Sequence, residues 1–323
     1  MKSMILAAGF GTRFRPVTYT LPKPMVPLLN KPLIAWAVDA LLGAGVAEII
    51  VNLHHLPEPL ERFLTLEYSG RAKFHFSFEE EILGTGGGVR RVRPLLENDE
   101  DFFLVNGDTI QFPPWDELRE ARRSRDSIAA ITLRHPPAND RFTPVYFENG
   151  HVTGFGQGTG EPLMFSGSHV ISSRIFQHLP DKEFSGIVDE VYQPQLDART
   201  ETLAGVVDDG VWFDIGKPSR YLSAMLGLLA TDVAKPAAIA ADAHIHGSVE
   251  RSTVGARSIV DGEIRDTAVW DDCNIGEGVR LERCIVAHGV TLRGPFEARD
   301  ALICAEDPAI PAEYERRNGV VVA

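Results

Sequence analysis

The sequence predicts a doubly wound, mostly parallel α/β sheet, followed by a short left-handed β-helix of hexapeptide repeats. Two observations carry this prediction. Short apolar runs alternate with helical patterns over roughly the first 230 residues, which is the sequence form of an α/β sheet. Beyond residue 243 the apolar residues recur every five or six positions, a period too long for one face of a strand and wrong for a helix.

The first half of the sheet can be taken element by element. We expect strands at 4–7, 48–53, 73–79 and 102–106 and helices at 33–44, 57–66 and 89–96. Gly45 closes the first helix. In a doubly wound sheet, ligands bind beyond the carboxyl ends of the strands. Gly9, Gly84 and Asp108 follow apolar runs and are therefore expected at that edge.

The second half of the sheet is less regular. Strands are expected at 127–133, 145–155 and 162–171, and the second of these is a hairpin that turns at Asn149 and Gly150. A strand end at 211–216 precedes a helix at 218–229, with Pro218 in its first turn. We therefore predict one catalytic domain over residues 1–232.

The C-terminal third has a different organisation. Residues 233–243 are rich in alanine and are predicted to be a linker, and residues 244–305 to form the β-helix, with three or four turns. Residues 306–323 are expected to be a polar tail. The apolar positions predicted to face the β-helix core are Val254, Ile259, Ile264, Val269, Ile275 and Leu281.

Composition narrows the class of protein. The chain has 323 residues and a formal net charge of −13, which argues against a nucleic-acid or anionic-membrane partner. No apolar run approaches the roughly 20 residues that span a bilayer, and we expect no signal peptide. The three cysteines form no C-x-x-C pair, so reduced thiols and a cytoplasmic location are expected.

A cationic loop follows the first strand. Arg13, Arg15, Lys23 and Lys31 fall in a stretch without acidic residues, and glycines at 9 and 11 let backbone N–H groups approach a ligand. Such a loop suits a polyanion such as a nucleoside triphosphate. Phe14 stands where a dinucleotide-binding fingerprint needs its third glycine, and no Gly-Lys-Ser/Thr ending of a P-loop is present.

Two carboxylates complete this set. Asp108 follows a buried-strand run, and Asp214 lies in an aromatic strand end over a hundred residues later. Mg²⁺ takes few protein carboxylates and completes its shell with phosphate oxygens and water. Together with the cationic loop, the two residues therefore predict a magnesium site.

The strings L-A-A-G-F-G-T-R, P-K-P and K-P between residues 6 and 32 resemble the signature of the sugar-1-phosphate nucleotidyltransferases, or NDP-sugar pyrophosphorylases. V-N-G-D and V-W-F-D-I-G match the strand ends that carry the family's metal-binding aspartates, here Asp108 and Asp214. The resemblance implies a nucleotide-diphospho-sugar transferase fold and the reaction of an NTP with a sugar 1-phosphate to give an NDP-sugar and pyrophosphate, with Mg²⁺.

Residue roles follow from this resemblance. Catalytic roles are assigned to Arg13, on the β and γ phosphates, and to Lys23, on the α phosphate. Nucleotide binding is assigned to Leu6, Ala7, Ala8, Gly9, Gly11, Thr12, Arg13, Glu81, Gly84, Thr85, Asn106 and Gly107. Sugar binding is assigned to Glu161, Ser166 and Gly167.

The substrate pair has two interpretations. Many family members carry Glu-Lys-Pro before the sugar-binding strand, whereas this chain has Gly160-Glu161-Pro162. In this feature and in Phe165-Ser166-Gly167 it resembles the N-acetylmuramate 1-phosphate uridylyltransferases. Those enzymes lack a β-helix, whereas GDP-mannose pyrophosphorylases have one. The first interpretation is a mannose-1-phosphate guanylyltransferase, and the alternative is a uridylyltransferase of an N-acetylated amino sugar 1-phosphate.

Two other functions fit the sequence less well. A non-catalytic regulatory subunit that binds an NDP-sugar is disfavoured because Arg13, Lys23, Asp108 and Asp214 are all present. A bifunctional enzyme with His288 as the base of an acyl transfer needs a longer β-helix. The β-helix is instead expected to join copies of the chain into a homo-oligomer, a dimer or larger.

Overall fold

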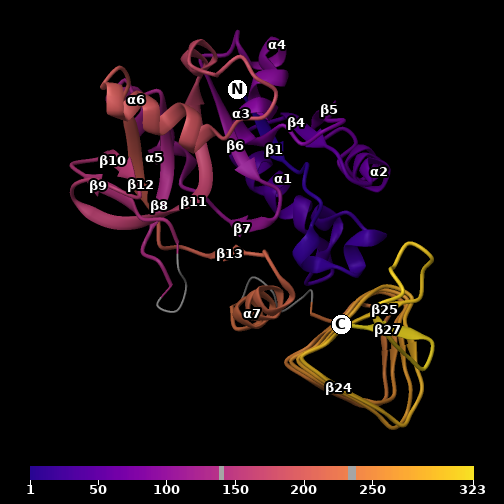
Figure 1. The fold of residues 1–323 in the computed structure, drawn as a ribbon. Helices are drawn as coiled ribbons and strands as arrows, with labels where there is room; N and C mark the ends of the chain where they lie inside the picture. Colours follow the sequence, from indigo (N-terminus) through magenta and orange to yellow (C-terminus); the bar gives the residue numbers. More distant parts are fainter. Residues whose placement is uncertain (138–141, 232–237) are drawn as a thin grey trace. The chain divides into compact units, whose positions relative to one another are not determined.

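Nine strands form the main sheet of the computed structural model, which describes residues 1–137, 142–231 and 238–323 (Figure 1). In spatial order they are β5 (Lys73–Phe78), β4 (Glu48–Leu53), β1 (Lys2–Leu6), β6 (Asp101–Asn106), β11 (Glu161–Ser172), β8 (Ala129–Arg134), β12 (Leu203–Val207), β10 (His151–Phe155) and β9 (Val145–Glu148).

The sheet is fully parallel in its first half and mixed in its second half, where β8 and β12 also run parallel. β5, β4, β1 and β6 run parallel to one another, as predicted. β11 is antiparallel to both β6 and β8, so the expectation of a mostly parallel sheet fails in the second half. β9 and β10 are joined by the two-residue turn at Asn149 and Gly150, which gives an antiparallel pair, whereas a parallel neighbour would need a crossover of a dozen or more residues.

The predicted helices of the first half are present, with one change of boundary. They are α1 (Leu33–Gly43), α2 (Pro57–Glu67), and α3 (Gly84–Arg91) with α4 (Arg93–Leu96). The helix predicted at 218–229 is α7 (Pro218–Leu229), whereas α5 (Trp115–Ser124) and α6 (Gln193–Ala198) were not predicted. The expected helix at 89–96 begins earlier, at Gly84, and is interrupted at Val92 before α4. Within the described ranges, no helix is long and apolar enough to cross a membrane.

Three parallel sheets stack along the C-terminal region and form the three walls of a coil, an arrangement that fits a β-helix (Figure 1). The first wall is β14 (His244–Ile245), β17 (Ile259–Val260), β20 (Asn274–Ile275) and β23 (Thr291–Leu292). The second is β15 (Ser248–Glu250), β18 (Glu263–Arg265), β21 (Val279–Glu282) and β24 (Phe296–Arg299). The third is β16 (Thr253–Val254), β19 (Ala268–Val269), β22 (Ile285–Val286) and β25 (Leu302–Ala305).

The predicted core positions of this coil are buried with one exception. Ile259 is half-buried, and Val260 points into the core in its place, stacked on Ile275. Because successive strand residues face opposite sides, an error of one residue exchanges core and surface. Cys273, Cys284 and Cys304 are free and buried, and burial raises the pKa of Cys273 to about 12.

The corners of the coil are held by stacked ion pairs. Arg251 binds Asp266 and Arg257 binds Asp272 through paired hydrogen bonds of 2.6 and 2.7 Å, each across one turn of 15 residues. All four residues have positive φ, between 45° and 60°. The left-handed conformation turns the chain at each corner, and the bidentate pairs offset part of its cost.

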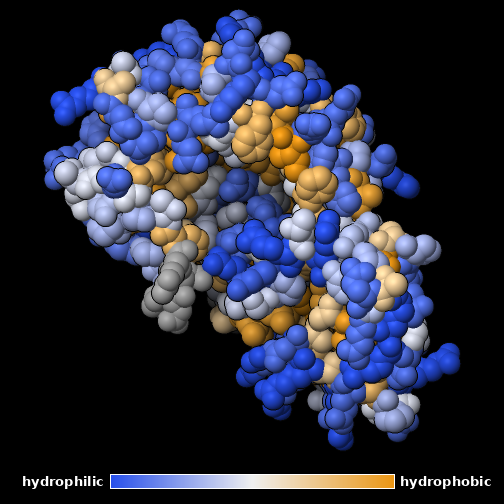
Figure 2. Space-filling model, viewed as in Figure 1, coloured by the Kyte–Doolittle hydropathy of each residue, from blue (hydrophilic) through white to orange (hydrophobic). Residues whose placement is uncertain are grey.

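The last residues are not a loose tail. β26 (Glu315–Arg317) and β27 (Val320–Val322) form an antiparallel hairpin, and β27 pairs antiparallel with β25. The hairpin therefore covers the free edge of the third wall, and the charged strand β26 becomes the new edge, which disfavours aggregation. In the view of Figure 2, hydrophilic residues cover most of the surface.

The chain clusters into two compact units by its internal contacts. The first unit comprises Met1–Gly9 and Trp36–Trp212, and the second comprises Phe10–Ala35 and Phe213–Ala323. The cationic loop thus belongs with α7 and the coil. The division predicted from the sequence, with domains at 1–232 and 244–305, stays a prediction, and residues 233–237 of the predicted linker lie outside the described residues.

Candidate active site

In the first unit, the ends of two parallel strands bring together predicted nucleotide-binding residues. Leu6, at the end of β1, is paired with Asn106, at the end of β6. The N–H of Gly107 donates to the carbonyl of Leu6 at 2.9 Å. Ala7 and Asp108 therefore follow two adjacent strand ends, where ligands of open α/β sheets bind.

A buried polar pair that the sequence analysis missed supports this edge. The Asn52 side chain accepts hydrogen bonds from the backbone N–H groups of Ala7 (2.7 Å) and Ala8 (3.3 Å) and donates to Glu79 Oε1 (2.8 Å). Glu79 Oε2 in turn accepts from the N–H of Leu83 at 2.9 Å. Asn52 and Glu79 are 3 % and 4 % exposed. The pair thus links Ala7 and Ala8, which follow β1, to Leu83, which precedes α3.

We expect Asn52→Leu to lower the free energy of unfolding by about 1–3 kcal/mol, because it removes the partner of the buried Glu79 Oε1 and of the partly buried N–H of Ala7. Asn98→Leu is the matched control, since Asn98 is exposed and its loss should change stability by no more than about 0.5 kcal/mol. Urea unfolding of both variants measures the difference. Equal unfolding midpoints would contradict the bridging role of Asn52.

The glycine segment at 84–88 forms the first turns of α3 rather than a separate turn. A Cβ on Gly87 would lie 2.2 Å from the carbonyl oxygen of Glu183, and one on Gly84, which has a φ of +72°, would lie 2.6 Å from that of Ser185. Thr85 Oγ1 accepts from the N–H of Ile187 at 2.8 Å. Close packing against residues 183–187 therefore requires these glycines, whereas Glu81 is exposed. A role in base recognition stays a prediction.

The predicted sugar side lies next to the same edge. Gly167 has a φ of +103°, and a Cβ there would lie 2.7 Å from Asn106 Nδ2, so only glycine lets β11 approach β6 this closely. Ser166 is buried; its hydroxyl donates to Thr132 Oγ1 at 2.6 Å, and its carbonyl accepts from the indole of Trp212 at 2.9 Å. The structure thus brings Ser166 and Gly167 together with the nucleotide-side Asn106.

Glu161 stands apart from that pair, in an exposed cluster with His135 and Asp209. The imidazole of His135 contacts Asp209 Oδ2 at 2.7 Å through Nδ1 and Glu161 Oε1 at 3.1 Å through Nε2. The hydrogen bond to Asp209, followed by that to Glu161, raises the pKa of His135 above its ordinary value of 6.5. The cluster ties the loop after β8 to the start of β11.

We expect the NMR titration of His135 to have its midpoint above pH 6.5, and Asp209→Asn to move it down. Because the folded-state pKa is raised, the stabilising contribution of the cluster is fully present below pH 6.5 and is lost as the pH rises through the folded-state pKa. Asp208→Asn is the neighbouring control and should shift the midpoint less. A wild-type midpoint at or below 6.5 would be inconsistent with this cluster.

In the second unit, the cationic loop folds tightly on itself through the short 3-10 helices η1 (Thr12–Phe14), η2 (Val17–Tyr19) and η3 (Lys23–Met25). Gly11 has a φ of +60°, and a Cβ there would lie 3.0 Å from both the Lys23 Cβ and the Thr18 Cγ2. Thr18 Oγ1 donates to the Gly11 carbonyl at 2.8 Å. Lys23 is only 7 % exposed, so its position is set by this packing.

Arg13 and Asp214 both lie next to Gly216 in this unit. A Cβ on Gly216 would lie 3.0 Å from Arg13 Nη1 and 3.0 Å from Asp214 Oδ2. Asp214, at the end of β13 (Trp212–Asp214), accepts a 2.8 Å ion pair from Arg220. Gly216 therefore leaves room for a cation predicted to bind phosphate beside a carboxylate predicted to bind metal.

Each of the two units carries one carboxylate that is predicted to bind a divalent metal. Asp108 and Asp214 offer carboxylate oxygens, the ligands that hard cations prefer, and both are partly exposed. Among the described residues, no group of three or more His, Cys, Asp or Glu side chains could hold a metal alone. Few protein carboxylates together with substrate phosphates is the pattern expected of Mg²⁺, not of a structural metal.

Comparisons with known proteins identify the family of this chain. A family model described as "Nucleotidyl transferase" matches residues 2–231. Mannose-1-phosphate guanylyltransferase 1 of Arabidopsis thaliana is 30 % identical over 91 % of this chain and 83 % of its own length, and the probable mannose-1-phosphate guanylyltransferase 2 of Oryza sativa is 32 % identical with the same coverage. A crystal structure of HddC from Yersinia pseudotuberculosis is 25 % identical, covers 70 % of this chain and 99 % of that one, and has a TM-score of 0.58.

The chain therefore belongs to the nucleotidyl transferase family. Its predicted resemblance to the sugar-1-phosphate nucleotidyltransferases is confirmed, and it is an enzyme of that class. Nucleotidyltransferases of this kind generally use a divalent metal.

Proposed function

We propose that this chain joins GTP and mannose 1-phosphate to give GDP-mannose and pyrophosphate. The observation that carries this proposal is the folded cationic loop, in which Lys23 packs beside Gly11 while Arg13 and Asp214 both lie next to Gly216. The base and the sugar are taken from the relatives, which are named mannose-1-phosphate guanylyltransferases and match along about nine-tenths of the chain.

The reaction requires positioning and charge neutralisation rather than a covalent nucleophile. The sugar phosphate oxygen attacks the α-phosphorus in line, and pyrophosphate leaves on the opposite side. Lys23 is held by its packing and would stabilise charge that develops on the α phosphate. Arg13 would hold the β and γ phosphates, and the backbone N–H groups of 9–12 would cradle the triphosphate.

Mg²⁺ is the proposed metal, with Asp108 and Asp214 as its protein ligands. When bound, it would neutralise phosphate charge and help orient the triphosphate. Arg220, which is ion-paired with Asp214 Oδ2, would hold that carboxylate in place before metal binds.

The start of β11 carries no lysine that could bind the phosphate of the sugar. Glu161 stands where many members of this class carry lysine, and its carboxylate forms a hydrogen bond with His135. A uridylyltransferase of an N-acetylated amino sugar 1-phosphate shares this feature and is the second candidate. A regulatory, non-catalytic subunit is the third.

A panel of substrates separates these candidates. Pyrophosphate release would be measured for ATP, CTP, GTP, UTP and dTTP, each with mannose 1-phosphate, glucose 1-phosphate, N-acetylglucosamine 1-phosphate and N-acetylmuramate 1-phosphate. The highest kcat/KM is expected for GTP with mannose 1-phosphate. A preference for UTP with N-acetylmuramate 1-phosphate would support the second candidate, and GDP-mannose binding without turnover of any pair would support the third.

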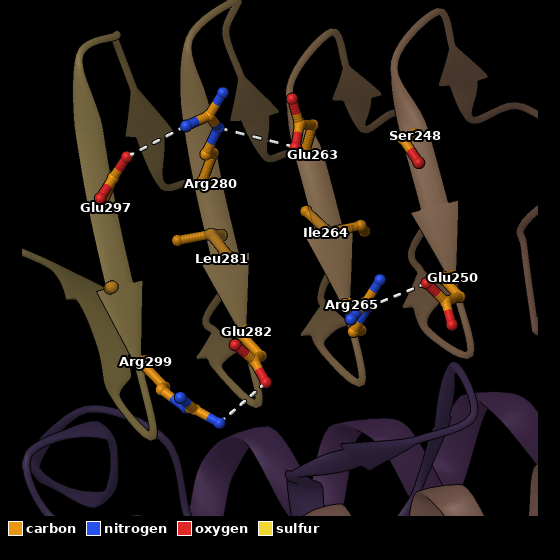
Figure 3. Close-up of a pocket in the computed structure, with 11 residues that line it drawn as sticks. Ser248, Glu250, Glu263, Ile264, Arg265, Arg280, Leu281, Glu282, Glu297 and Arg299 are labelled. Carbon is orange, nitrogen blue, oxygen red and sulfur yellow. Dashed lines mark hydrogen bonds and ion pairs between the residues drawn. The ribbon is translucent and has the colours of Figure 1, made fainter.

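We also propose that the coil is left-handed and joins copies of the chain. Its second wall carries a hollow of about 630 Å³ lined by alternating charges (Figure 3). Glu263 and Arg280, and likewise Glu250 and Arg265, alternate in sign along two columns. If a second copy faced this wall with its own second wall, related by a two-fold axis in the plane of the wall, the glutamates of one copy would lie opposite the arginines of the other.

We expect the double variant Arg265→Glu, Arg280→Glu to sediment as a smaller species than the wild type, because it places like charges across that wall. Arg257→Glu, on a corner of the coil, is the control and should sediment as the wild type does. If the double variant keeps the wild-type sedimentation coefficient, copies of the chain do not meet through this wall.

A further inference from the structure

A chain of hydrogen bonds runs from the coil to the loop that carries Lys23. The indole N–H of Trp270 donates to the Tyr221 hydroxyl at 3.1 Å, and this hydroxyl donates to the carbonyl of Pro27 at 2.6 Å. Trp270 follows strand β19, Tyr221 lies on α7, and Pro27 is four residues beyond Lys23. Trp270 and Tyr221 are 2 % and 1 % exposed.

The direction of these two bonds is fixed by chemistry. An indole N–H can only donate and a proline carbonyl can only accept, so Tyr221 must accept from Trp270 and give its own proton to Pro27. Burial raises the pKa of the Tyr221 phenol, which therefore keeps that proton at neutral pH. The same ring packs edge-on against Phe14, next to Arg13, with ring centres 5.9 Å apart.

The hairpin after Lys23 makes a second contact with the coil. Strands β2 (Pro27–Leu28) and β3 (Lys31–Pro32) are joined by Leu29 and Asn30, which have φ values of 53° and 60°. Asn30 Nδ2 donates to the carbonyl of Val254 in β16 at 3.1 Å. Positive φ is costly for leucine and persists where the surroundings impose it, and Leu29 is only 2 % exposed.

The C-terminal hairpin region supplies a third contact. The ring of Tyr314 meets that of Tyr19 edge-on at 6.2 Å, and the guanidinium of Arg15 lies 4.7 Å from the centre of the Tyr19 ring. Two separate parts of the coil region thus touch residues 15–30 directly, and a third, at Trp270, reaches Pro27 through Tyr221. Such contacts stabilise the fold. All of them also reach residues 15–30, the segment that contains Lys23, which is predicted to bind phosphate.

We propose that the coil is a positioning element of the active site, in which Trp270 and Tyr221 hold the Pro27 carbonyl and thereby set the place of Lys23. This goes beyond the proposed role in assembly and rests on the proposed role of Lys23. The coil would then be required for full turnover even in a single copy of the chain.

Tyr221→Phe is the sharpest variant, because it removes one oxygen and keeps the ring against Phe14. It leaves the buried Pro27 carbonyl without its donor, and we expect kcat to fall about tenfold to a hundredfold, as for a small misplacement of a catalytic group. The KM for sugar 1-phosphate should change little. Phe296→Leu, in the core of the coil, is the matched control and should lower thermal stability with kcat within about twofold of wild type.

A double-mutant cycle with Lys23→Ala separates positioning from general destabilisation. If Tyr221 acts through Lys23, adding Tyr221→Phe to Lys23→Ala should lower kcat by less than about twofold. An equal loss in both backgrounds, or a kcat of Tyr221→Phe near that of wild type, would overturn the positioning role alone. Wild-type turnover by Lys23→Ala would overturn the proposed role of Lys23 and this inference with it.

Discussion

Asp108→Asn and Asp214→Asn are each expected to lower turnover by at least about a hundredfold, the size of one preorganised charged group. An amide in place of a carboxylate removes a negative ligand while the shape of the side chain is kept. The thermal unfolding midpoint should change little, because both side chains are partly exposed. Steady-state turnover over a Mg²⁺ titration measures the effect, and removing Mg²⁺ with EDTA should abolish wild-type turnover.

Matched variants make this result specific. Asp116→Asn, an exposed carboxylate on α5 that pairs with Arg119, should keep wild-type turnover. Arg220→Gln breaks the ion pair of Asp214 but leaves its carboxylate, so it should cost far less than Asp214→Asn. Wild-type turnover by Asp108→Asn or Asp214→Asn, at any Mg²⁺ concentration, would remove that residue from the metal site.

Lys23→Ala is expected to lower kcat by about a hundredfold or more with little change in nucleotide affinity. The Lys23 side chain is largely buried, and its amine would follow charge that appears on the α phosphate mainly in the transition state; losing such an interaction lowers the maximal rate. Arg13 would hold the β and γ phosphates in the ground state as well. Arg13→Ala should therefore raise the KM for the nucleotide more than Lys23→Ala does.

Steady-state kinetics of both variants at saturating Mg²⁺ decide between the two roles. Arg62→Ala is a suitable control, since Arg62 lies on α2 among residues to which no part of the reaction is assigned. The reverse pattern, in which Lys23 affects only affinity and Arg13 only the rate, would show that the two roles are exchanged.

Local patterns predicted much of the fold. The strand at 48–53, the helix at 218–229 and the turn at Asn149 and Gly150 were all located, because alternation, a first-turn proline and an Asn-Gly pair act over a few residues. The C-terminal hairpin was missed, because β27 is held by β25 and not by its own sequence. The strand β11 was located, but its antiparallel direction was missed for the same reason, because its partners are far away in the chain.

In the candidate site, too, local motifs were predicted and contacts between distant residues were not. Glycines and cations of the signature were found in one string, whereas the Asn52–Glu79 pair joins two strands. A signal for it existed, because Asn52 interrupts an apolar run, and a buried amide must find partners. The contact of Tyr221 with Pro27 spans 194 positions and has no local signal at all.

The most direct measurement is the product balance of one reaction. Incubation of the chain with GTP, mannose 1-phosphate and Mg²⁺ should yield GDP-mannose and pyrophosphate in equal amounts, and neither product should form when mannose 1-phosphate is left out. Release of inorganic phosphate in place of pyrophosphate, or the absence of both products with every nucleotide and sugar 1-phosphate of the panel, would contradict the proposed nucleotidyl transfer.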